Sequence, residues 1–310
     1  MSFKVPTSRV TRNAKVQGSN MRIIHDLDEM TETARGWLSG GIIGFIPTVG
    51  YLHAGHASLI QAARQECEYS IVSIFVNPLE FDQDEAPILY PNNLTGDIQF
   101  LDKEQVDVVF IPRFEEMYPP DFSTYVVVFG PVAERLEAAF RPEHVRGYAT
   151  NIVKLLQLVR PDVAYFGQNN AQHVALIRRL VRDLSIDVKL QVLPTVRDTD
   201  GLALSIRNQA LSPEERQAAP LLYQALLAGK ALIEQGERNL ALIEKTMVDV
   251  ITASPFIKLD YATACDPQSF EQPGDMLPET LTDLLLVVAA HFGTTRLNDN
   301  LLLRDGHWLI

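Results

Sequence analysis

Two histidines, His53 and His56, are the residues of this chain best suited to chemistry. They follow an apolar run and the loop Thr48-Val49-Gly50, and they open a stretch with helical periodicity. Residues at i and i+3 lie on the same side of a helix, and the free N–H groups and dipole at a helix N-terminus favour an anion. The pattern therefore predicts a phosphate site. The alternative is that one histidine caps the helix and the other lies on the surface.

The elements that must position these histidines follow from hydrophobic patterning. From residue 21 onward, short β-branched or aromatic runs alternate with helical periodicity, which predicts βαβ units, a mainly parallel sheet and an α/β fold. The expected strands are 42–47, 69–77, 106–112, 163–167 and 189–196. The expected helices are 57–67, 151–158 and 171–184.

A second, smaller unit is predicted after residue 196. The turn-rich stretch RDTDGLALS leads to Ser212-Pro213, a serine N-cap with proline at the first helical position. Helices over 220–235 and 240–253 and strands over 257–264 and 284–290 predict an α+β unit. We expect a first domain over 21–196 and a second over 197–310. Residues 1–20, basic and without an acid, are expected to be a disordered extension, with an organelle-targeting arm as the alternative.

Composition excludes several classes of protein. At 310 residues and 46% apolar, the chain can fill one large or two modest cores. Its formal charge of −12 makes nucleic acid a poor partner. No apolar run approaches the roughly 20 residues that cross a bilayer, so we expect no membrane partner. Cys67 and Cys265 lie outside any metal or disulfide spacing, which favours a reducing, cytoplasmic setting, and we assign no protein metal site.

The segment His53-Ala54-Gly55-His56 resembles the HxGH signature of the nucleotidyltransferase superfamily. The wider sequence, from about residue 21 to residue 300, is similar to the pantoate–β-alanine ligase family. An ordered set of motifs is more specific than any one of them. The matching segments are GFIPTVGYLHAGH, SIFVNP, EEMYP, RPEHVRGYAT, YFGQ, DGLALSIRN, LSPEER and TRLNDN.

The resemblance implies a Rossmann-like nucleotide-binding domain, a smaller C-terminal lid domain, a homodimer, and ATP with Mg²⁺. The family activates pantoate as an acyl adenylate, and the amine of β-alanine then displaces AMP. Carried over to this chain, the catalytic residues are His53, His56, Glu80 and His173. The ATP-binding residues are Thr48, Val49, Gly50, His53, Gly55, His56, Gly167, Asn169, Asn170, Ser205 and Arg207. The substrate-binding residues are Asn77, Glu80, Phe81, Arg141, Phe166 and His173.

Several positions depart from the family pattern. The lysine that grips the ATP phosphates is replaced by Asn169, and the aspartate after it by Asn170. The glutamine that holds pantoate is replaced by His173, and a second glutamine, between the two substrates, by Glu80. Other replacements are Ile206 within the serine pair, Asn92 at the arginine of YPR, and Glu143 at a glycine.

The resemblance and its departures together predict a ligase that forms an amide through an acyl adenylate, with an acid and an amine other than pantoate and β-alanine. Two alternatives stay open. One is an ATP-independent enzyme on the same scaffold that uses Glu80 and His173 as an acid/base pair. The other is a non-catalytic paralogue that binds ligand.

Overall fold

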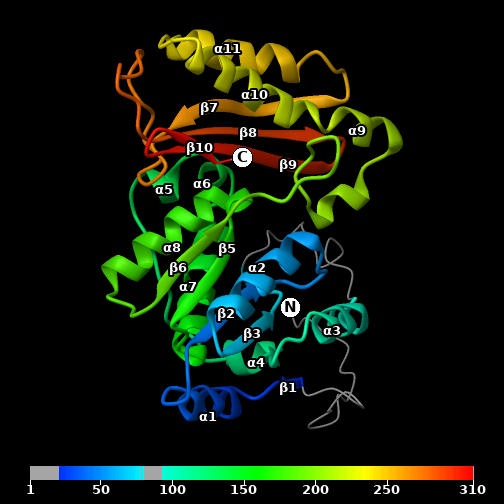
Figure 1. Cartoon of the computed structure of the whole chain (residues 1–310), viewed down its shortest axis with the longest axis vertical. Coiled ribbons are helices and arrows are strands. Elements are labelled where there is room, and N and C mark those ends of the chain that lie inside the picture. Colours follow the sequence, from blue (N-terminus) through cyan, green and yellow to red (C-terminus); the bar gives the residue numbers. More distant parts are fainter. Residues whose placement is uncertain (1–20, 78, 80–92, 310) are drawn as a thin grey trace.

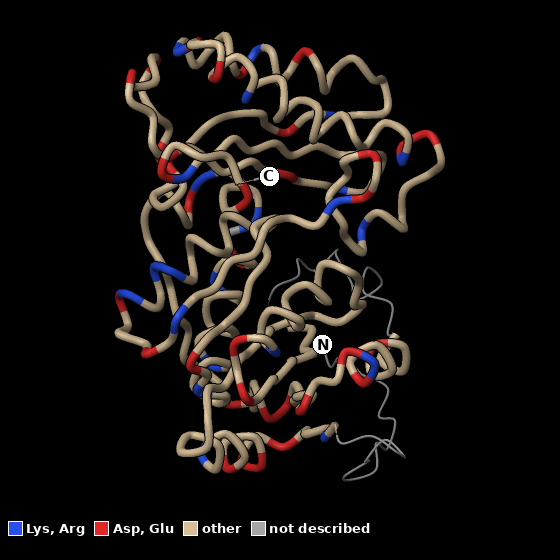
Figure 2. Tube along the Cα trace, viewed as in Figure 1, with Lys and Arg blue, Asp and Glu red and all other residues tan. Residues whose placement is uncertain are grey.

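The computed structural model describes residues 21–77, 79 and 93–309. The predicted extension 1–20 and the predicted site residues Glu80 and Phe81 lie outside the described residues. Within this part of the chain, no helix is both long and apolar enough to cross a membrane. Figure 2 shows acidic and basic residues interspersed along the described part of the trace, with basic residues recurring along the helix at 171–183.

A six-stranded parallel sheet forms the larger unit (Figure 1). Its strand order is β1-β4-β3-β2-β5-β6. The chain builds outward from β2 in one direction and then, with β5, in the other, so the order reverses between β2 and β5. Ligands of open α/β sheets bind at such a switch point, beyond the carboxyl ends of the strands. The strands are β1 (Arg22–Ile24), β2 (Ile43–Thr48), β3 (Tyr69–Ile74), β4 (Val108–Phe110), β5 (Val163–Gly167) and β6 (Lys189–Leu193).

Helices cover both faces of this sheet, because successive strand residues point to opposite faces. Phe45 belongs to the core under α1, α7 and α8, whereas its neighbour Ile46 belongs to the core under α2 and α3. The long helices are α1 (Leu27–Trp37), α2 (Ala54–Glu66), α3 (Leu94–Lys103), α7 (Pro142–Val159) and α8 (Ala171–Asp183). The short ones are α4 (Phe114–Met117), α5 (Pro131–Glu134), α6 (Glu137–Phe140) and the 3₁₀ helix η3 (Gln168–Asn170).

The smaller unit is a four-stranded antiparallel sheet, of order β10-β9-β8-β7, that lies between two helices and the larger unit (Figure 1). Alternate residues of β8 divide between two cores: Leu286 packs under the helices, and Leu285 joins the core of the larger unit. Its elements are η4 (Ile206–Ala210), α9 (Pro213–Ala218), α10 (Leu221–Glu234), α11 (Leu240–Ile251), β7 (Ile257–Cys265), β8 (Leu284–Phe292), β9 (Thr295–Arg304) and β10 (His307–Leu309).

The α/β fold with a smaller α+β unit is confirmed, and the differences from expectation have local causes. Helix α7 begins at Pro142 rather than at residue 151, because proline is favoured in the first turn. Helix α2 begins at Ala54 rather than at residue 57, because His53 caps it. Strand β9 was not expected, since its polar residues interrupt the apolar pattern. The boundary after residue 196 stays a prediction, as does the lid role of the second unit.

Candidate active site

A cavity of about 330 Å³ lies at the carboxyl ends of β2 and β5, where the two units meet. Its walls come from the loop before α2, from α7 and α8, from the segment 194–208 and from β9. It brings together most of the residues predicted from sequence. These are Thr48, Val49, Gly50, His53, Gly55, His56, Arg141, Phe166, Gly167, Asn169, Asn170, His173, Ser205 and Arg207.

His53 and His56 cap the N-terminus of α2 reciprocally. His53 Nδ1 accepts a hydrogen bond from the Gly55 backbone N–H (3.1 Å), and His56 Nδ1 accepts one from the His53 backbone N–H (3.2 Å). Because both Nδ1 atoms are acceptors, the neutral rings carry their proton on Nε2. Burial lowers the pKa of His53, and burial followed by the nearby His53 ring lowers the pKa of His56 to about 3. Both rings line the cavity as neutral Nε2–H donors, and neither is exposed.

The glycines of this loop are required by close contacts. A Cβ at position 55 would lie 2.9 Å from Cε1 of His53, so Gly55 leaves room for the capping ring. Gly50 has φ +88°, and a Cβ there would lie 3.0 Å from Oδ2 of Asp97. The buried Asp97 carboxylate, from α3, accepts the backbone N–H groups of Tyr51 (2.7 Å) and Leu52 (2.8 Å). Asp97 therefore positions the loop. The sequence does not indicate this role, because a single aspartate in an amphipathic helix is usually a surface residue.

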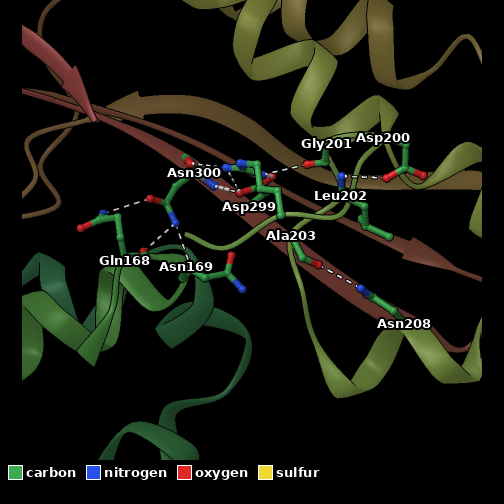
Figure 3. A network of polar contacts seen from close by, with 10 residues as sticks. Gln168, Asn169, Asp200, Gly201, Leu202, Ala203, Asn208, Asp299 and Asn300 are labelled. Carbon is green, nitrogen blue, oxygen red and sulfur yellow. Dashed lines mark hydrogen bonds and ion pairs between the residues drawn. The ribbon is translucent and has the colours of Figure 1, made fainter. Parts of the chain in front are cut away.

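A second wall is held by Asn300 of β9 (Figure 3). Its side-chain Nδ2 donates to the carbonyls of Gln168 and Asn169 (3.0 Å each), and its Oδ1 accepts from Gln168 Nε2 (3.0 Å). These bonds fix the turn between β5 and α8. They leave the buried Oδ1 of Asn169 without a hydrogen-bond partner in the described part of the chain.

The segment 197–208 is anchored by a buried ion pair. Arg197 binds Asp299 through two hydrogen bonds (2.6 and 3.0 Å), and its guanidinium lies 3.8 Å from the centre of the Tyr223 ring. Further along, Ser205 Oγ caps η4 by accepting the Arg207 N–H (3.2 Å). Sequence reasoning placed Ser205 and Arg207 in the site, and this anchoring brings both to the cavity.

The third wall lies between α7 and α8 and contains a pair of imidazoles; it is the α7–α8 wall. Nε2 of His144, on α7, lies 3.1 Å from Nε2 of His173, on α8. The Tyr148 ring stacks on His173 with centroids 4.0 Å apart. Burial, followed by the nearby His144, Arg207 and Arg141, lowers the pKa of His173 to about 3. Sequence reasoning missed His144 and Tyr148, whose i, i+4 spacing within a helix was the available signal.

Asn77 is the described residue of the predicted site that does not line the cavity. It is fully buried, and its Nδ2 donates to Tyr118 Oη and to the Gly147 carbonyl (3.3 Å each). Its Oδ1 accepts from the Leu79 backbone N–H (3.1 Å). Its amide therefore holds the chain after β3, and its predicted role in substrate binding stays a prediction. The proposed pairing of Glu80 with His173 stays a prediction.

In the described ranges, no three His, Cys, Asp or Glu side chains gather as a metal would require. Three aspartates of the described chain pair with arginines instead. Asp198 and Asp200 both bind Arg216, and Asp183 binds Arg179 and Arg182.

Comparison with protein families gives a match along almost the whole chain. The family model described as Pantoate-beta-alanine ligase matches residues 22–302. The pantothenate synthetase of Heliobacterium modesticaldum is 44% identical over 282 residues, which cover 91% of this chain and 99% of the relative. That of Chloroflexus aggregans is 42% identical over 284 residues, covering 91% of this chain and all of the relative.

Solved structures agree with the family match. The pantothenate synthetase of Thermus thermophilus is similar with a TM-score of 0.85 and 39% identity, covering 92% of this chain and all of that one. The pantoate–β-alanine ligase of Francisella tularensis, complexed with β,γ ATP and β-alanine, is similar with a TM-score of 0.73 and 32% identity. That likeness covers 90% of this chain and 97% of the other.

Proposed function

Because the chain belongs to the pantoate–β-alanine ligase family, we propose that it joins a carboxylic acid to an amine through an acyl adenylate. The observation that carries this proposal is the reciprocal cap of α2. It presents two neutral Nε2–H groups and a helix N-terminus to a cavity at the switch point of the sheet.

The reaction needs negative charge to be stabilised on phosphate. The carboxylate oxygen of the acid bonds to the α-phosphorus of ATP as pyrophosphate leaves, and the amine nitrogen then bonds to the acyl carbon as AMP leaves and protons are released. The Nε2–H groups of His53 and His56 would donate to the phosphate oxygens where charge grows. Because the capping bonds fix both rings beforehand, these donors need no reorganisation during the reaction.

Several features of the cavity suit ATP. A Cβ at Gly167 would meet nothing within 4 Å, so the end of β5 leaves room for a ligand. Among the described residues, the buried Oδ1 atoms of Asn169 and Asn208 have no hydrogen-bond partner and would accept from the N–H and O–H groups of adenosine. Arg207 supplies positive charge, and Ser205 holds it there. Mg²⁺ would enter on the ATP phosphates and neutralise part of their charge.

The residues on the α7–α8 side of the cavity support the proposal that the substrates differ from pantoate and β-alanine. The family glutamine that holds pantoate is replaced by His173, whose Nε2 is engaged with His144. Tyr148 stacks on the same ring, so an imidazole that packs against a phenol ring stands where an amide is expected. A side-chain amide donates and accepts at fixed atoms, whereas an imidazole changes its donor with tautomer. We propose that this wall selects a different acid.

Turnover assays test the proposed function. Purified protein with ATP and Mg²⁺ is offered a panel of acids and amines that includes pantoate and β-alanine, and AMP and pyrophosphate are measured. We expect both to appear with one acid–amine pair. Saturable product without ATP would favour the ATP-independent alternative, although the hydrogen bond to His144 and the lowered pKa make His173 a weak base. Ligand affinity without turnover would favour the non-catalytic paralogue.

We also propose that the protein is a homodimer formed through the segment 125–129. Tyr125, Val127 and Phe129 are 42%, 52% and 76% exposed, while Val126 and Val128 pack against the core of the larger unit. This alternation leaves an exposed apolar face that a second copy can cover. Val127→Asp should shift the protein from dimer to monomer in light scattering, and Leu242→Asp, at an exposed site on α11, should not.

A cytoplasmic location is proposed from the cysteines. Cys67 and Cys265 are both free thiols, and burial raises the pKa of each. Such thiols persist in a reducing compartment.

A further inference from the structure

The imidazole pair of the third wall stands among positive charges. His144 and His173 meet through their Nε2 atoms at 3.1 Å, between α7 and α8. Arg141, at the start of α7, and Arg207, of η4, both line the cavity, and the positive charge of each lowers the pKa of His173. Two guanidinium groups and two imidazoles therefore converge on one part of the cavity.

The hydrogen bond limits how many protons this pair can hold. One Nε2 must carry a proton and the other must offer its lone pair. The neutral pair therefore has one unprotonated Nδ1, on the ring that donates. One added proton can bind there and turn the Nε2–H···Nε2 contact into a stronger, charge-assisted bond. A second added proton would place N–H groups on both Nε2 atoms and break the contact, so the pair is a site for one proton.

In the protein without ligand, the surroundings oppose that proton. The His173 ring is largely buried, and the charges of Arg141 and Arg207 disfavour a third cation. Two acids that line the cavity are already paired: Glu137 with Arg296 and Tyr261, and Asp299 with Arg197. An anion bound against the two arginines would reverse this balance, because it neutralises them and attracts the proton.

We propose that His144 and His173 form a one-proton subsite, which binds an oxyanion of the substrate together with a proton and with the help of Arg141 and Arg207. The oxyanion is a carboxylate or a phosphate, both of which the proposed ligase reaction would bring to the cavity. The inference rests on the proposed function only in that respect. It assigns His144, a residue outside the sequence-predicted site, to ligand binding.

Calorimetry in paired buffers measures the proton directly. Acetate, as a carboxylate probe without substituents that the wall could reject, and inorganic pyrophosphate, as the phosphate probe, are titrated into the full-length protein in buffers of low and high ionisation enthalpy from pH 8 to pH 5.5. For the ligand that occupies the subsite, we expect uptake that approaches one proton as pH falls. Its affinity should rise with decreasing pH, by at most tenfold per pH unit. The probe that shows uptake identifies the oxyanion.

Matched variants assign the proton to the pair, since His53 and His56 also titrate. His173→Gln and His144→Gln should each abolish the uptake and flatten the pH dependence of affinity. His307→Gln, at an exposed position on β10, should change neither. The ¹⁵N spectrum of labelled histidines gives a second readout, because the ligand should convert two ring signals from neutral to shared-cation shifts in the unaltered protein.

Clear outcomes would overturn the proposal. These are buffer-independent binding of both probes, uptake that survives in His173→Gln, or failure of both probes to bind. The proposed function is judged separately. Amide formation with ATP but without proton uptake removes only this subsite, and proton-coupled binding without amide formation removes only the ligase assignment.

Discussion

Two walls of the cavity are built by different means. At the α2 wall (Gly50, His53, Gly55, His56), the capping contacts of the two histidines join residues two or three positions apart, and the side chains bind backbone N–H groups. Asp97 of α3 adds the long-range contacts that hold the loop after Gly50. At the α7–α8 wall (His144, Tyr148, His173), the contact that matters joins residues 29 positions apart and involves side chains alone. The first wall is part of the folding of its own helix, so its chemistry is tied to local structure. The second can change its residues while the helices stay in place.

The largest expected effect tests the difference between the α2 wall and the α7–α8 wall directly. His56→Ala removes one preorganised donor and one half of the cap, and should slow pyrophosphate release by about 100- to 1,000-fold. His173→Gln should slow it by less than about tenfold with the preferred acid, because an oxyanion held at the α7–α8 wall is bound in the ground state as well as in the transition state. The α2 wall, by contrast, meets the charge that grows during the reaction. Equal losses in the two variants would contradict this difference.

Acid should destabilise both walls. The pKa of His56 and of His173 is about 3 in the folded protein and 6.5 when unfolded, so below pH 6.5 the unfolded state binds more protons. Stability from these rings is complete above pH 6.5 and is lost as pH falls toward 3, by at most about 1.4 kcal/mol per pH unit for each histidine. Urea unfolding of His173→Gln from pH 7 to pH 4.5 should show a shallower decline than the unaltered protein. Parallel curves would show that the pKa of His173 does not differ between the folded and the unfolded protein.

A glycine replacement sharpens the comparison at the α2 wall. Gly55→Ala places a Cβ against the His53 ring and should disrupt the cap, at a cost of about 1 kcal/mol in the free energy of unfolding. Gly36→Ala, at an exposed position of α1 with no atom near its Cβ, is the control and should stabilise by about 0.5–1 kcal/mol. Opposite signs for the two substitutions, measured by urea unfolding, are the expected result.

The smallest expected effect concerns Gly167, which ends β5 and lines the same cavity. Gly167→Ala meets no atom and should leave the free energy of unfolding within about 0.5 kcal/mol of its original value. Its methyl group would occupy ligand space and weaken ATP binding several-fold in calorimetry. Gly274→Ala also meets no atom, but it lies away from the cavity and should leave affinity unchanged.

The sequence predicted the α2 wall more fully than the α7–α8 wall, for a physical reason. The spacing of His53 and His56 and the glycines of the loop predict a local geometry. Any fold that contains this helix would keep that geometry. The meeting of His144 with His173 depends on how α7 packs against α8, which periodicity does not reveal. Asn77 shows that a polar residue within a matching motif can also bind the interior of the fold, since its amide donates to Tyr118 and to the Gly147 carbonyl. Strand β9 escaped prediction because Asp299 and Asn300 are buried polar residues whose partners lie far away in sequence.

The division of β8 between two cores has a consequence for cooperativity. Leu285, Val287 and Leu302 pack with the larger unit, while their neighbours on the same strands pack under α10 and α11. If the smaller sheet melted alone, it would strip apolar cover from the larger core, so partial unfolding carries a penalty in both units. The protein should therefore unfold in one transition with a single denaturant midpoint. A fragment that ends at residue 196 would lack that cover and would tend to associate through the uncovered surface.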